Sequence, residues 1–79
     1  MVTVRYFAGA RAAVGVDTET RQAATLADLV GQIVDAHGEQ LERVLTACSF
    51  LVDGTSTRDR ALVLAPGAVV DVLPPFAGG

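Results

Sequence analysis

The chain has 79 residues, a net charge of −3 and a hydrophobic content of 51%. This length fits one small domain, and the apolar content is high enough for a core and excludes a disordered chain. The negative charge argues against a nucleic-acid partner, and no apolar run is long enough to span a bilayer. With one cysteine, Cys48, and no secretory signal pattern, we expect a cytoplasmic protein.

The first strand is predicted over residues 2–7, where β-branched and aromatic residues alternate between two faces. One face carries Val2, Val4 and Tyr6, whereas Phe7 falls on the other. This alternation is typical of a strand with one face in the core.

Two shorter elements follow the first strand. Residues 8–14 predict a short helix that ends at Gly15, since glycine readily adopts the left-handed conformation of a helix C-terminus. Residues 16–22 alternate weakly and predict an edge strand.

The main helix is predicted to begin after Thr25, because Thr25 and Asp28 have the spacing of a capping box. His37 and Gly38 end it, and a histidine at a helix C-terminus has a mild capping role. The apolar residues follow the helical period and form one stripe: Leu26, Leu29, Val30, Ile33 and Val34.

The second half of the chain predicts a short helix and two strands. Residues 39–47 favour the helix, and residues 50–52 favour a strand closed by the turn signal Asp53-Gly54. Residues 55–60 are polar and are predicted as a loop.

The C-terminal part of the pattern ends in a strongly apolar strand. The segment 62–64 is apolar, but its pattern does not decide between strand and loop. Pro66-Gly67 predicts a type II turn, and residues 68–73 predict the last strand. That strand is too apolar to lie at a sheet edge.

These elements predict an α+β fold of the β-grasp, or ubiquitin-like, class, with a mixed sheet curled around one main helix. We expect a single domain over residues 1–79, with a protruding C-terminal tail over residues 74–79. A ferredoxin-like fold is the alternative, but it needs a second long helix, which residues 39–47 are too short to supply.

The sequence contains no set of residues that predicts catalysis by this chain alone. His37 is the single histidine, no ligand spacing predicts a metal site, and the glycines match no phosphate-binding loop. Cys48 precedes a predicted buried strand and is interpreted as a small core residue. We therefore expect a substrate or carrier for other enzymes, with no permanently bound cofactor.

One exposed patch is predicted beside the tail. If Val70 and Val72 face the helix, Leu73 faces outward, as does Phe7 on the first strand. Because the first and last strands pair in a β-grasp fold, Phe7 and Leu73 are predicted to lie together as a partner-binding surface.

The C-terminus is the most specific feature of the sequence. Two prolines end sheet pairing and stiffen the chain, and the glycines allow passage through a channel too narrow for side chains. The last glycine presents a carboxylate that suits another protein's active site. The tail consists of Pro74, Pro75, Phe76, Ala77, Gly78 and Gly79.

Over essentially its whole length the chain resembles the small, sulfur-carrying subunit of molybdopterin synthase, of the MoaD/ThiS ubiquitin-like family. The double proline before Gly-Gly is the specific part of the resemblance. The resemblance rests on residues 4–8 with Arg11, 25–29, 52–54, 66–67 and 73–79.

The resemblance implies that Gly79 is adenylated with ATP and Mg by a ubiquitin-activating-like enzyme and converted to a thiocarboxylate. That group then enters the large synthase subunit and donates sulfur to the pterin precursor, while a sulfur donor protein supplies the sulfur. The implied partner contacts are Pro74, Pro75, Phe76, Ala77 and Gly78 of the tail, with Phe7, Arg11 and Leu73 of the domain.

Two other classes of function remain open. One is a sulfur carrier for thiamine, cysteine or tRNA thiolation, with the same chemistry and another client. The other is a ubiquitin-like protein modifier or interaction domain. The chain has no lysine, which excludes only the linking of copies of itself into isopeptide chains.

Overall fold

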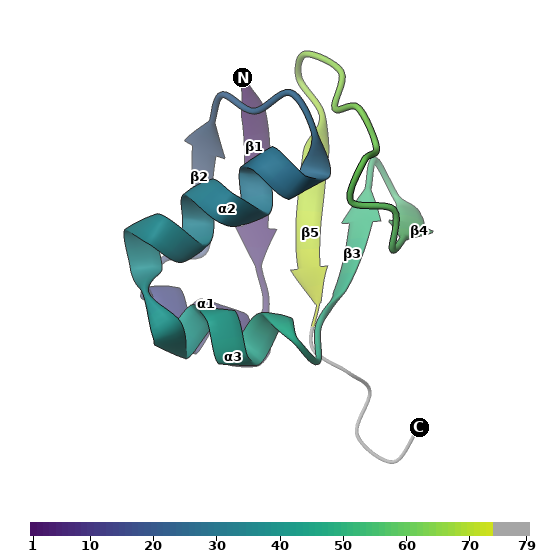
Figure 1. The fold of residues 1–79 in the computed structure, drawn as a ribbon. Helices are drawn as coiled ribbons and strands as arrows, with labels where there is room; N and C mark the ends of the chain where they lie inside the picture. Colours follow the sequence, from purple (N-terminus) through teal and green to yellow (C-terminus); the bar gives the residue numbers. More distant parts are fainter. Residues whose placement is uncertain (74–79) are drawn as a thin grey trace.

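In the computed structural model, which describes residues 1–73, five strands form one mixed sheet and three helices pack against it (Figure 1). The strand order is β2-β1-β5-β3-β4, which confirms the predicted β-grasp class. The elements are β1 (Val2–Tyr6), α1 (Ala8–Val14), β2 (Thr18–Arg21), α2 (Leu26–His37), α3 (Glu39–Leu45), β3 (Ser49–Val52), β4 (Thr55–Thr57) and β5 (Val69–Leu73). None of these helices is long and apolar enough to cross a membrane.

The last strand lies at the centre of the sheet, as its apolar sequence predicted. β5 pairs in parallel with β1, from Thr3–Val69 to Tyr6–Val72, and antiparallel with β3 on its other side. Val70 is completely buried on its inner face. An interior position satisfies the backbone groups of such a strand on both sides.

Helix α2 crosses the inner face of the sheet (Figure 1) and supplies much of the core. The Asp28 N–H donates to the Thr25 hydroxyl at 3.1 Å, so Thr25 caps the helix as predicted. The Asp28 carboxylate accepts from the Ala24 N–H rather than from the N–H of Thr25 itself. Of the predicted stripe, three residues are at most 1% exposed and two are partly buried: Leu26, Leu29 and Ile33, then Val30 and Val34.

The junction between α2 and α3 is a single glycine. Gly38 ends α2 as predicted; its φ of 85° is positive, but its ψ of −168° is not that of a left-handed helix. This conformation lets one residue end α2 and begin α3. Helix α3 ends at Leu45, two residues earlier than predicted, and it buries Leu41 and Leu45.

The prediction of a loop over residues 55–60 is wrong for its first half. Asp53 and Gly54 have φ values of 49° and 85°, and two consecutive positive values make the tight turn of a β-hairpin. The chain therefore returns as β4, antiparallel to β3. The undecided segment 62–64 is no strand: its Val63 makes an isolated bridge to Thr25.

A polar cluster centred on Glu19 ties α2 to the sheet. Its carboxylate lies 2.7 Å from the Tyr6 hydroxyl, 2.7 Å from Arg21 Nε and 2.6 Å from His37 Nε2. Burial alone would raise the pKa of the Glu19 carboxyl. The three hydrogen bonds have a larger opposite effect, so the pKa of Glu19 lies below its ordinary value. Burial of Tyr6 and its hydrogen bond to Glu19 raise the pKa of the Tyr6 hydroxyl. Thus His37, predicted as a helix-end residue, also bonds across to β2.

Ile33→Ala tests the helix register. Ile33 is fully buried at the centre of the α2 stripe, so we expect a loss of about 2–5 kcal/mol of unfolding free energy. A small domain has only about 5–15 kcal/mol in total. Denaturant unfolding measures the loss, with Asp35→Ala on the exposed side of α2 as control. Equal, small changes in both variants would contradict the register.

Glu19→Gln tests the polar cluster by its pH dependence. A carboxyl whose folded pKa is lowered stabilises the fold above its unfolded pKa and loses this contribution as pH falls through the folded value. The wild type should therefore be more stable than Glu19→Gln near neutral pH, and the difference should shrink below about pH 4.5. Melting temperatures from about pH 7 to about pH 3 measure it. A difference independent of pH would contradict the depressed pKa.

Candidate functional site

The candidate site lies at the end of the sheet where β1 and β5 both terminate. Parallel strands end at the same edge, so the chain leaves β5 at Leu73 beside the residue that follows β1, Phe7 (Figure 1). The Phe7 N–H donates to the Val72 carbonyl at 3.2 Å, which extends the pairing by one step. The six predicted tail residues lie outside the described part of the chain: Pro74, Pro75, Phe76, Ala77, Gly78 and Gly79.

Phe7 and Leu73 occupy the positions that the alternation predicted. Phe7 is 38% exposed and Leu73 is partly exposed. Phe7 is also the N-cap of α1, and Ala8 after it has φ 48°, an unusual value for a residue other than glycine. This sharp bend turns the chain into α1 and leaves the Phe7 side chain at the end of the sheet.

Arg11 joins Phe7 in a shallow hollow of about 290 Å³ at this end. Arg11 Nη1 lies 3.6 Å from Asp17 Oδ1, and both side chains are well exposed, so this ion pair contributes little to stability. The structure thus brings Phe7 and Arg11 together, whereas Leu73 lies outside the hollow. Its lining consists of Arg5, Tyr6, Phe7, Arg11, Asp17 and Thr18.

An ion pair that was not predicted from the sequence lies on the open face of the sheet. Arg5 donates from Nε and Nη2 to the two carboxylate oxygens of Asp71, at 2.5 and 2.8 Å. Asp71 is only 7% exposed, and its hydrogen bonds and charge raise the pKa of Arg5. The signal was present, because both residues occupy outward positions of two strands that were predicted to pair.

The same face carries partly exposed apolar side chains around the Arg5–Asp71 pair. Three apolar residues face the same side of the sheet as Asp71: Val69 and Leu73 on β5, and Leu51 on β3. Helices α2 and α3 lie on the opposite side of the sheet, and α1 lies at the end of the sheet where β1 terminates (Figure 1). Within residues 1–73 this face therefore has no covering element.

The described residues contain no arrangement that predicts catalysis. Residues 1–73 hold no group of three or more metal-ligating side chains. Cys48 is partly buried against the core, and burial raises the pKa of its thiol, which makes it a weak nucleophile.

A β-grasp sheet with its last strand at the centre, ending beside an exposed aromatic residue, defines a ubiquitin-like protein. The sequence profile of the ThiS family matches residues 4–79. The chain therefore belongs to the ThiS family of ubiquitin-like sulfur carriers. No curated protein matched the sequence.

Several solved structures share this fold. SAMP1 from Haloferax volcanii is 25% identical, with a TM-score of 0.78 over 99% of this chain and 98% of that one. In the complex of subunits 1 and 2 of the molybdopterin-converting factor from Helicobacter pylori, one chain is 26% identical, with a TM-score of 0.76 over 99% and 97%. The small archaeal modifier protein 1 of Methanosarcina acetivorans, at 21% identity and a TM-score of 0.88 over 99% and 95%, supports the fold.

Proposed function

We propose that this protein is the small subunit of a molybdopterin synthase, which carries sulfur as a thiocarboxylate on Gly79. The observation that supports this most is that the ThiS family profile extends through the Gly-Gly end of the tail to residue 79. The parallel β1–β5 pair supports it further, because the chain leaves the domain beside Phe7 and Arg11.

The chemistry needs only a presentable carboxylate from this chain. A carboxylate oxygen of Gly79 attacks the α-phosphate of ATP, and pyrophosphate leaves. A sulfide or persulfide sulfur then attacks the acyl carbon and displaces AMP, which is a far better leaving group than oxide; from a persulfide, reductive cleavage of the S–S bond by a thiol releases the thiocarboxylate. ATP and Mg belong to the adenylating enzyme, and the sulfur comes from a donor protein. In this proposal the chain is not catalytic alone.

The proposed partner surface joins the tail to the end of the sheet. The large subunit contacts Phe7, Arg11 and Leu73 of the domain. Gly78 passes through the narrow entrance to the active site of the large subunit. The similar Helicobacter pylori chain was solved in complex with a second subunit of its molybdopterin-converting factor, which supports a partner subunit for this chain. The remaining proposed contacts are Pro74, Pro75, Phe76 and Ala77.

Protein modification is the second candidate, since the Haloferax volcanii protein of similar fold is a SAMP1. In that case Gly79 forms an amide bond with a target lysine instead of receiving sulfur. Sulfur carriers for thiamine, cysteine or tRNA thiolation form a third class. The double proline before the glycines favours the molybdopterin assignment.

Removal of Gly79 tests the thiocarboxylate. The wild type, incubated with the adenylating enzyme, ATP and a sulfur donor, should gain the mass difference of one oxygen-to-sulfur exchange in intact-mass spectrometry. A chain lacking Gly79, and a chain extended by one alanine, should fold normally and gain none. Equal thiolation of the shortened chain would refute the proposal.

Phe7→Ala and Leu73→Ala test the partner surface. Each should weaken binding to the large subunit by about 1–3 kcal/mol, because exposed apolar anchors carry much of an interface's energy. Titration calorimetry measures the affinity. Val63→Ala is the matched control, since Val63 is 73% exposed but lies in the loop that bridges to the start of α2.

Unchanged affinity in both test variants would show that Phe7 and Leu73 are ordinary surface residues. If the wild type instead bound a thiazole synthase and not the large subunit, the chain would belong to thiamine synthesis.

A further inference from the structure

A second hollow lies on the β3–β4 side of the sheet end, across β5 from Phe7. It has a volume of about 400 Å³, which is within the range of ligand-binding clefts. Ser49, at its rim, pairs with Leu73, so the hollow borders the point where the chain leaves β5. We call it the arginine hollow; its lining is Leu45, Thr46, Ala47, Cys48, Ser49, Phe50, Ser56, Thr57, Arg58 and Arg60.

The charge of the arginine hollow is opposite to that of the protein. The chain has a net charge of −3, yet the lining contains two arginines and no carboxylate. Four other arginines pair with acidic side chains: Arg5, Arg11, Arg21 and Arg43. Arg58 and Arg60 form no ion pair with any of residues 1–73. Two unneutralised cations at one hollow attract an anion.

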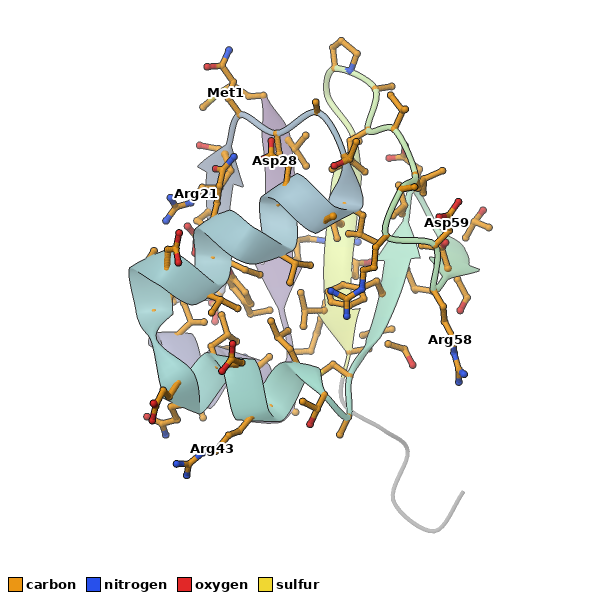
Figure 2. The ribbon with its side chains drawn as sticks, in the orientation of Figure 1. Met1, Arg21, Asp28, Arg43, Arg58 and Asp59 are labelled. Atoms are coloured by element: carbon orange, nitrogen blue, oxygen red, sulfur yellow. The ribbon has the colours of Figure 1, made fainter. Side chains whose placement is uncertain are left out.

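The neighbouring acidic groups leave this charge available. The Asp59 carboxylate, between the two arginines in sequence, accepts from the Ala61 N–H and shapes its own turn. Glu42 borders a smaller hollow that shares Arg60, but no ion pair joins them. Arg58 extends outward from the β4 side of the molecule (Figure 2).

The volume of the hollow and the placement of Arg60 favour a carboxylate-bearing peptide over a bare ion. The Arg60 guanidinium lies over the Phe50 ring, 5.1 Å from its centroid, which fixes its plane and leaves its N–H groups to bind a carboxylate. Beneath the charges, Leu45 and Phe50 are only 5% and 3% exposed, so the hollow offers a ligand mainly its two guanidinium groups and small polar side chains. Carboxylates carried on a peptide segment match such a lining.

We infer that the arginine hollow binds an acidic segment of the adenylating enzyme, a role that rests on the proposed function. That enzyme must hold the carrier firmly while the terminal carboxylate stays free to reach ATP. Its binding energy therefore has to come from surfaces near the base of the tail but not from the reacting group. The arginine hollow is such a surface, and it is separate from the Phe7 and Arg11 side of the sheet end.

The double variant Arg58→Gln/Arg60→Gln tests this role in the carrier-dependent ATP–pyrophosphate exchange of the adenylating enzyme. The KM for the carrier should rise about tenfold or more, the equivalent of about 1.4 kcal/mol, with kcat unchanged, because docking is weakened and the terminus is intact. The wild-type KM should also rise with salt more steeply than that of the variant.

Arg43→Gln is the matched control, because Arg43 is exposed on α3, on the other side of the molecule from Arg58 (Figure 2). Arg58→Lys/Arg60→Lys keeps the charges but not the guanidinium plane, so its KM should lie between those of the wild type and the glutamine variant. An unchanged KM in the glutamine variant would overturn the inference. So would an equal rise in the Arg43→Gln control.

A second measurement does not depend on the proposed function. An amidated peptide of alternating Asp and Leu, titrated into the labelled protein, should shift the amide resonances of Cys48, Ser49 and Thr57. The matching Asn and Leu peptide should not. Absent shifts, or equal shifts with both peptides or with inorganic phosphate, would overturn the inference. If the wild type fails in the exchange assay but binds the acidic peptide, the proposed function fails and the arginine hollow stands.

Discussion

β1 and β5 pair in parallel at the centre of the sheet, from Thr3–Val69 to Tyr6–Val72. Parallel neighbours end at the same edge, so this pairing alone brings the start of α1 and the exit of β5 together. It also aligns inner faces on which Val4 and Val70 are fully buried under α2. Core packing and the position of the candidate site therefore depend on the same register, because a slip by one residue would reverse both faces.

The outer face of this strand pair depends on one ion pair. Asp71 is almost completely buried without a covering helix, and the bidentate contact with Arg5 supplies the hydrogen bonds that a buried carboxylate requires. Opposite charges at directly paired positions favour the observed register over its neighbours. The pair thus adds specificity to a face whose other residues are small or apolar.

The described residues contribute surfaces rather than reactive groups. Phe7 and Arg11 lie on one side of the sheet end, and Arg58 and Arg60 lie on the other. In the proposed role, two separate surfaces would let different enzymes hold the domain while its terminal group stays free to react. The partly buried Cys48 is consistent with this, since a thiol with a raised pKa does not compete for acyl chemistry.

Most of the fold could be predicted from local patterns. The α2 stripe follows the helical period of 3.6, and the first strand alternates with a period of 2 at Val2, Val4 and Tyr6. The Thr25 cap was predicted from its spacing to Asp28, and the central position of the last strand from its apolar content. β4 was missed because its polar residues carry no periodic signal, and only pairing with β3 makes them a strand. The sequence by itself determined the elements other than β4, the core face and the tail's composition. Only the tertiary structure decided which charges pair, because the alternation placed Arg5 and Asp71 on one face without fixing their register, and Glu19 meets His37 through a contact between residues distant in the chain.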